Sequence, residues 1–153
     1  MIKKIRHNVF ETNSSSTHSI CIAKDSSLTI PKEIHFGTGE FGWERNSLRS
    51  MYSKASYLYT GLLYNNRMTD FFDIVGLLEK EGITVTYDSH KDEGYVDHGY
   101  NLGNFLNKVC KDKESLMSYL FSDLSYIETG NDNDDYDVDI VVDYPHEIFY
   151  KGN

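Results

Sequence analysis

The stretch NSLRSMYSKASYLYTGLLYN, residues 46–65, decides the fold class, because its apolar residues recur every three or four positions. This spacing places side chains on one face of an α-helix, so the stretch predicts an amphipathic helix. The apolar positions that share this spacing are Leu48, Met51, Tyr52, Ala55, Leu58, Tyr59, Leu62 and Leu63. The sequence patterns on either side of this stretch indicate which elements pack against the helix.

Further helical patterns follow along the chain. Thr69 is a suitable N-cap for a second helix, and Gly82 stands where a helix end favours a left-handed residue. Apolar spacing predicts two more helices, near 102–109 and 116–121, with a break between them at 111–113. The middle of the chain is therefore predicted to be largely helical.

Strand patterns lie mainly toward the two ends of the chain. Residues 2–9 and 17–23 predict two strands joined by a polar turn, and 83–87, 136–144 and 147–150 predict three more. Glycine-punctuated stretches are interpreted as loops, at residues 31–44 and 88–100. Strands at both ends around a helical middle predict an α+β fold with a mostly antiparallel sheet.

Length and composition bound the domain organisation. The 153 residues, 39% of them hydrophobic, fit a single domain over residues 1–153. A chain of about 150 residues buries roughly 70% of its unfolded surface, so folding needs no disulfide or metal. Cys21 and Cys110 make no disulfide framework, and the sequence shows neither a signal peptide nor a long apolar run. We therefore expect a cytoplasmic protein.

The formal net charge of −9 is concentrated in residues 123–143, which we name the acidic segment. It holds eight acidic residues and no Lys or Arg, whereas the rest of the chain has 16 acidic and 15 basic residues. Its acids are Asp123, Glu128, Asp132, Asp134, Asp135, Asp137, Asp139 and Asp143. Such a segment produces a strongly negative local field.

The acidic segment favours some partners over others. Binding to duplex nucleic acid needs clustered Lys and Arg, so the expected partners are basic protein surfaces or cations. An EF-hand is excluded because, counting from Asp135, Ile140 and His146 stand where the loop needs Gly and Glu. The alternative is a solvated loop that serves solubility alone. The residues expected to face a basic partner are Asp132, Asp134, Asp135, Asp137, Asp139 and Asp143.

The block FETNSSSTHS, residues 10–19, holds the densest set of groups that could bind a metal or an anion. Strand alternation places His18 on the apolar face of Ile20 and Ile22, where an imidazole needs a partner. The alternatives are a capped turn and a core histidine with satisfied hydrogen bonds. A zinc ion needs three or four converging ligands. The candidate ligands are His18, Asp97, His98, Glu11 and Glu40, with Glu44 and Cys21 as further completions.

Motifs for other chemistry are missing from the sequence. The serines near His18 have no Gly-x-Ser-x-Gly elbow, and no Walker loop or dinucleotide-binding glycine motif occurs. Nucleophilic, ATP-dependent and NAD-dependent catalysis therefore have no support. We expect a protein that is not an enzyme.

Four blocks resemble a family of small proteins from phages and mobile elements of Gram-positive bacteria. The blocks are FETNSSSTHS at 10–19, GEFGWE at 39–44, Asp97-His98, and TGND at 129–132. The resemblance implies a phage origin and a bacterial host cell. A small acidic phage protein is similar to the anti-CRISPR inhibitors, some of which present carboxylates to the DNA channel of a type II CRISPR effector nuclease.

Two hypotheses for function follow. The first is a host-defence inhibitor, a DNA mimic that binds a basic surface of a type II CRISPR effector nuclease and blocks loading of target DNA. A structural zinc could rigidify such an inhibitor. The second is a metal-dependent enzyme acting on a nucleotide or nucleic acid, with His18, Asp97 and His98 as ligands and Glu11 as general base.

Overall fold

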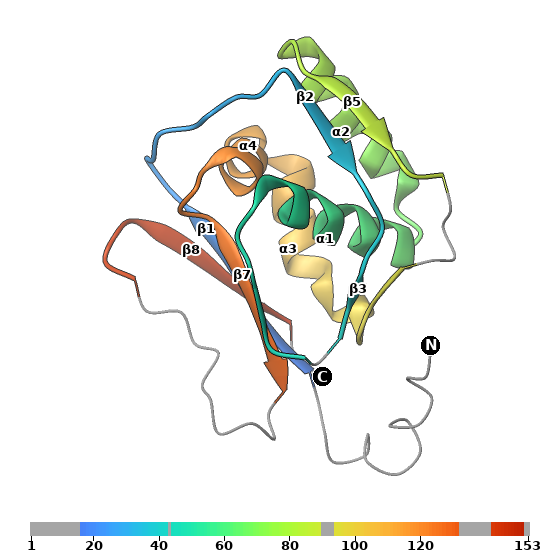
Figure 1. The fold of residues 1–153 in the computed structure, drawn as a ribbon, viewed down its shortest axis with the longest axis vertical. Helices are drawn as coiled ribbons and strands as arrows, with labels where there is room; N and C mark the ends of the chain where they lie inside the picture. The colour runs from blue at the N-terminus through green and yellow to red at the C-terminus, as the bar shows by residue number, and fades with distance from the viewer. Residues whose placement is uncertain (1–15, 43, 90–93, 132–141, 152–153) are drawn as a thin grey trace.

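The computed structural model describes residues 16–42, 44–89, 94–131 and 142–151, and shows an α+β fold (Figure 1). The strands are β1 (Ser16–Ala23), β2 (Glu33–Phe36), β3 (Glu40–Phe41), β4 (Asn46–Leu48), β5 (Thr84–Tyr87), β6 (Tyr95–Val96), β7 (Tyr126–Asn131) and β8 (His146–Lys151). The helices are α1 (Met51–Tyr64), α2 (Met68–Lys80), α3 (Gly103–Lys111) and α4 (Lys113–Phe121). The 3-10 turn η3 (Gly99–Leu102) directly precedes α3. Within these residues, no helix has the length and apolar character needed to cross a membrane.

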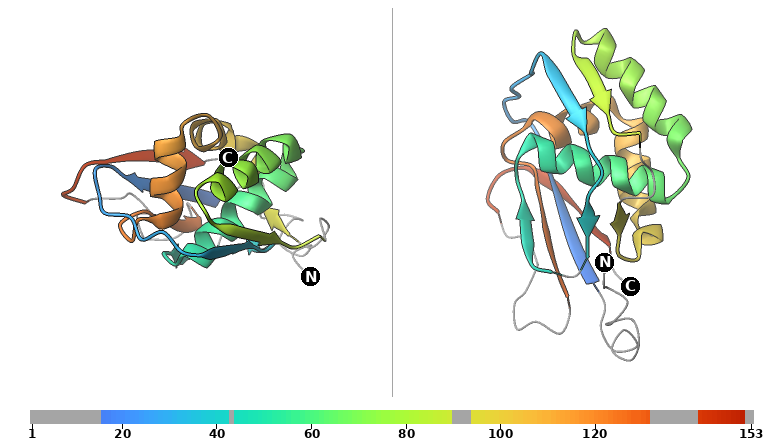
Figure 2. Two further views of the ribbon diagram at one scale, coloured as in Figure 1. Left: turned by 90° about the horizontal axis from the view of Figure 1, so that it is seen from above. Right: turned by 45° about the vertical axis from the view of Figure 1, so that its right-hand side comes forward.

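The main sheet has the strand order β4-β7-β1-β8, and each neighbouring pair is antiparallel. This confirms the prediction of a mostly antiparallel sheet built from both ends of the chain. Two short parallel pairs, β2–β5 and β3–β6, lie outside it. The helices gather on one face of the main sheet, and the β2–β5 pair lies beside α1 and α2 (Figures 1 and 2).

Strand β1 is the centre of the main sheet and is covered on both faces. Ile20 and Ile22 point into the core formed with the helices, as the alternation predicted. Cys21 points the other way, where it packs with Tyr126 and with partly buried residues of the chain just before and within β8. Because β1 is also flanked by strands on both edges, its buried polar groups need partners inside the protein, and within the described residues the Ser19 hydroxyl of this strand has none.

The helix predicted at residues 46–65 begins later than expected. Residues 46–48 form β4 on the edge of the sheet, and α1 starts at Met51. The start is fixed by Ser50, whose hydroxyl oxygen accepts a hydrogen bond of 3.0 Å from the Ser53 N–H. Most of α1 is buried, so it is a core helix rather than a helix with one solvated face.

Other boundaries both confirm and correct the sequence predictions. Gly82 does adopt the left-handed conformation after α2, with φ of 86°. Thr69 is not the N-cap, because α2 begins one residue earlier, at Met68. The break between α3 and α4 falls at Asp112, within the predicted interval.

Several predicted loops and strands also need correction. The stretch 31–44 contains β2 and β3, and the stretch 88–100 contains β6. Strand β7 was not predicted, because it lies inside the acidic segment, whereas β8 confirms the strand at 147–150. Residues 142–144 are not in a strand, and the predictions for residues 2–9 and 136–141 lie outside the described residues.

A buried lysine holds one end of β1 to the helical layer. Lys54 of α1 is 1% exposed, and its Nζ donates hydrogen bonds of 2.8 and 2.9 Å to the carbonyls of Ser122 and Ser125. The Ser125 hydroxyl in turn accepts a hydrogen bond of 2.9 Å from the N–H of Ala23, the last residue of β1. Burial lowers the pKa of Lys54 to about 8, which shows how far the amine is removed from water.

We predict that Lys54→Ala lowers the free energy of unfolding by about 3 kcal/mol, because it removes a packed side-chain stem and two hydrogen bonds to buried carbonyls. Urea unfolding followed by circular dichroism measures the change. Lys32→Ala is the control, since Lys32 is exposed, and it should change stability by less than about 0.5 kcal/mol. A Lys54→Ala variant as stable as this control would contradict the assigned role.

Candidate functional site

The structure brings described residues of all four sequence blocks together at the first half of β1. In the main sheet, His18 pairs with Thr129 of β7 on one side and Lys151 of β8 on the other. Gly42 and Asp97 reach the same place through the β3–β6 pair and the residues that follow it. Residues 10–15, 43 and 132 of these blocks lie outside the described residues. We call the described part of this assembly the junction.

His18 is a fully buried histidine with both ring nitrogens hydrogen-bonded. Its Nε2 lies 2.9 Å from the carbonyl oxygen of Gly42, an acceptor, so Nε2 carries the proton. Its Nδ1 lies 2.7 Å from the hydroxyl oxygen of Tyr57, so this nitrogen accepts a hydrogen bond from the tyrosine. The pKa of His18 falls to about 4, because burial penalises the imidazolium and Lys151 adds repulsion. His18 is therefore neutral, with no free lone pair for a metal.

Lys151 supplies a buried cation next to His18. It is 0% exposed, and its Nζ donates to the carbonyls of Ser16, at 3.1 Å, and Asp97, at 2.8 Å. A third hydrogen bond goes to the Ser16 hydroxyl, so the three N–H groups of an ammonium all have acceptors. Burial lowers the pKa of Lys151 to about 8, while the nearby charge of Asp97 opposes this shift. The lysine, at the end of the edge strand β8, thereby joins the start of β1 to the chain after β6.

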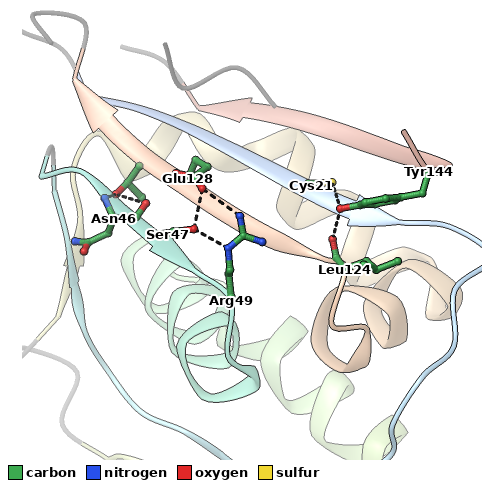
Figure 3. Close-up of polar contacts among 8 residues, drawn as sticks. Cys21, Asn46, Ser47, Arg49, Leu124, Glu128 and Tyr144 are labelled. Atoms are coloured by element: carbon green, nitrogen blue, oxygen red, sulfur yellow. Dashed lines mark hydrogen bonds and ion pairs between the residues drawn. The ribbon is translucent and has the colours of Figure 1, made fainter. Parts of the chain in front are cut away.

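Thr129 fixes the opposite side of the junction. Its hydroxyl donates a hydrogen bond of 2.8 Å to the carbonyl of Glu44 and accepts one of 3.0 Å from the N–H of Asn46. Figure 3 shows this contact at the start of β4. The threonine thereby ties the GEFGWE block to β7. The side chain of Glu44 is exposed rather than directed into the junction.

The predicted metal ligands are not assembled in the described structure. Asp97 and His98 are neighbours, with 3.9 Å between Oδ2 and Nε2, but the other ring nitrogen of His98 contacts the Tyr100 hydroxyl at 2.9 Å. Glu40 is exposed, Cys21 lies on the opposite face of β1 from His18, and Glu11 is outside the described residues. Among residues 16–42, 44–89, 94–131 and 142–151, no group of three or more His, Cys, Asp or Glu could hold a metal.

The face of the main sheet away from the helices carries the ends of the acidic segment (Figure 3). Glu128 accepts a hydrogen bond of 2.7 Å from the Ser47 hydroxyl and lies 3.6 Å from the guanidinium of Arg49. The same guanidinium lies 3.8 Å above the ring of Tyr126. The Tyr144 hydroxyl donates to the Leu124 carbonyl at 2.7 Å and lies 4.0 Å from Cys21 Sγ. These contacts anchor the chain on both sides of residues 132–141.

The expected partner-binding residues are only partly described. Asp143 is exposed, as is Asp123 at the other end of the segment. Among the described acids of the acidic segment, Glu128 is not exposed, because it is half-buried against Arg49. Asp132, Asp134, Asp135, Asp137 and Asp139 lie outside the described residues.

Sequence reasoning missed two residues of the junction, Tyr57 and Lys151. Tyr57 falls off the apolar stripe that predicted the helix, so its burial could not be read from that spacing. Lys151 did have a signal, because strand alternation places it on the same side as the partly buried Phe149. A lysine at an inward position of a strand indicates a buried amine that needs acceptors.

We predict that His18 makes the folded state sensitive to acid. Its pKa is about 4 in the folded protein and about 6.5 when unfolded, so the unfolded chain binds more protons between these values. The free energy of unfolding should therefore fall as the pH drops from 7 toward 4, by about 2–3 kcal/mol from this residue. His18→Gln keeps a donor and an acceptor but does not titrate in this range. The free energy of unfolding of this variant should therefore fall less than that of the wild type over the same change of pH, by the contribution of His18. Urea unfolding at both pH values tests this, and identical pH dependence in the two proteins would contradict it.

No family model, no curated protein and no solved structure matches the chain. The features that bear on function are therefore the junction and the acidic segment.

Proposed function

We propose that the protein is an inhibitor that binds a basic, nucleic-acid-binding surface of another protein and keeps nucleic acid from loading there. The observation that carries this proposal is the separation of charge in the chain. Eight acids and no basic residue lie within the acidic segment, while the remainder of the chain is close to neutral. A local negative field of this kind attracts clustered Lys and Arg.

The fold supports the proposal by giving the acidic segment a rigid base. The segment includes β7 and runs on toward β8, and these strands flank β1 on its two sides. At the exit, Val142 and Tyr144 pack against Cys21 and Tyr126 of the sheet. Anchoring both ends reduces the conformational entropy that binding has to overcome.

The chemistry of the partner follows from the charge. A surface that binds DNA carries Lys and Arg spaced to meet phosphates, and carboxylates can occupy the same positions. The type II CRISPR effector nuclease is the partner to be tested first, because its DNA channel is such a surface and the sequence blocks resemble phage proteins. An inhibitor of this kind competes with DNA and needs no catalysis.

The metal-dependent enzyme is the weaker alternative. Its main ligand, His18, has both nitrogens engaged with Tyr57 and Gly42. Using it as a ligand would break a buried hydrogen bond. No observation on the described residues favours this second function over inhibition.

We predict that neutralising Asp134, Asp135, Asp137 and Asp139 to Asn weakens binding to the guide-loaded effector at least tenfold, or about 1.4 kcal/mol, because each loses an attraction to a basic side chain. Calorimetry or surface plasmon resonance measures the affinity, at low and at physiological salt. Wild-type affinity should fall steeply with salt, and the variant's should fall less.

The control is a variant with the same net charge and the acidic segment intact. Asp25→Asn, Glu33→Gln, Asp73→Asn and Glu79→Gln change four exposed residues elsewhere, and both variants go from −9 to −5. The control should bind like wild type. An equal loss of affinity in both variants would contradict a specific role for the acidic segment. If the wild-type protein does not bind, the type II CRISPR effector nuclease is excluded as the partner.

A further inference from the structure

The parallel pair β2–β5 carries a second cluster of polar side chains, outside the junction and the acidic segment. His35 of β2 and Thr86 of β5 are direct neighbours in the register of the two strands. His35 Nδ1 lies 2.7 Å from the Thr86 hydroxyl, and His35 Nε2 lies 2.9 Å from Oδ1 of Asp88. Hydroxyl, imidazole and carboxylate thus form a continuous hydrogen-bonded chain.

The direction of each hydrogen bond in this chain follows from the carboxylate. An ionised Asp88 only accepts, so His35 Nε2 carries the proton and donates it. In the neutral imidazole, Nδ1 then has a free lone pair, and the Thr86 hydroxyl donates to it. This is the arrangement in which an imidazole activates a hydroxyl as a nucleophile.

Asp88 is held in place by the surrounding backbone. Its Oδ2 accepts a hydrogen bond of 3.1 Å from the Thr38 N–H, and its carbonyl accepts one from the Tyr59 hydroxyl. Gly37 leaves the room this requires, because a Cβ there would lie 2.8 Å from the Tyr52 hydroxyl and 3.3 Å from Asp88 Oδ2. The carboxylate is therefore a positioning group with a fixed orientation toward His35.

The cluster is open to solvent on the outer face of the pair. The side chains of His35 and Asp88 are each 41% exposed, and Thr86 is exposed. The alternate residues of these strands, Phe36 and Val85 among them, face the core. Strand alternation also directs the N–H of Tyr87 away from β2.

We propose that Thr86 is a nucleophile activated by His35 and positioned by Asp88, and that it takes an acyl group from a small ester. Thr86 Oγ1 attacks the ester carbonyl while its proton moves to His35 Nδ1. The carbon–oxygen bond to the alcohol then breaks, and the alcohol leaves with that proton. Water, deprotonated by His35, attacks the acyl-threonine, and Thr86 Oγ1 regains a proton as the acid departs.

A fluorophosphonate probe tests the nucleophile directly, because the hydroxyl displaces fluoride and forms a stable adduct. Intact mass spectrometry measures the rate of modification of the full chain, and peptide sequencing locates the adduct. We expect one adduct, on Thr86. His35→Gln should lower the rate about a hundredfold, and Asp88→Asn should lower it to a smaller extent.

Thr84 is the matched control, since it is an exposed threonine on the same face of β5 without a neighbouring imidazole. Thr84→Ala should label like wild type, Thr86→Ala should not label, and Thr86→Ser should keep the reaction. Circular dichroism checks that each variant folds. No adduct on Thr86, or an unchanged rate in the His35→Gln variant, would overturn the proposal and would leave the inhibitor proposal untouched.

Discussion

The complete burial of β1 is the constraint on which the rest of this structure depends. Strands cover both of its edges, the helices cover one face, and Tyr144 with its neighbours covers the other. Such a strand would be simple to stabilise if it were apolar, but its first half is polar. Each buried polar group there costs free energy unless it is paired, so the surrounding chain has to deliver donors and acceptors to fixed positions. The hydrogen bonds of His18 and Lys151 meet this requirement, and Lys54 does the same beyond the far end of the strand. The Ser19 hydroxyl is the exception in the described part of β1, because it is buried without a partner.

This requirement explains why residues far apart in the sequence gather at one place. Gly42, Tyr57 and Asp97 each contribute an atom that β1 or its neighbours cannot supply, and they come from a loop, a helix and a turn. The junction uses neutral groups and an amine with depressed pKa, whereas the carboxylates that the structure describes are exposed or only partly buried. Stability and surface charge are thus assigned to different parts of the molecule. Changes in the acidic segment can alter binding without removing the hydrogen bonds that hold the sheet.

The sequence was sufficient for the features that depend on local periodicity. Helical spacing located all four helices, and alternation placed Ile20 and His18 on the inward face of β1. It failed where short strands carry little pattern: Leu48 continues the helical spacing of α1, yet it belongs to β4, which pairs with β7. Strand β7 was hidden because the acids of the surrounding segment dominated the interpretation of residues 123–143. The partners of His18 could not be found, because Tyr57 lies 39 residues away and only the folded chain shows which hydroxyl faces the imidazole.

The state of the His18 ring is the most direct measure of whether the first half of β1 is sealed from water. Long-range nitrogen–proton NMR correlation on the intact protein identifies which ring nitrogen carries the proton and follows its titration. We expect a neutral ring at pH 6, protonated at Nε2, with a slowly exchanging proton and a pKa of about 4. A ring that titrates near its ordinary value of about 6.5, with rapid proton exchange, would show that His18 is open to water and that the junction is not formed as described.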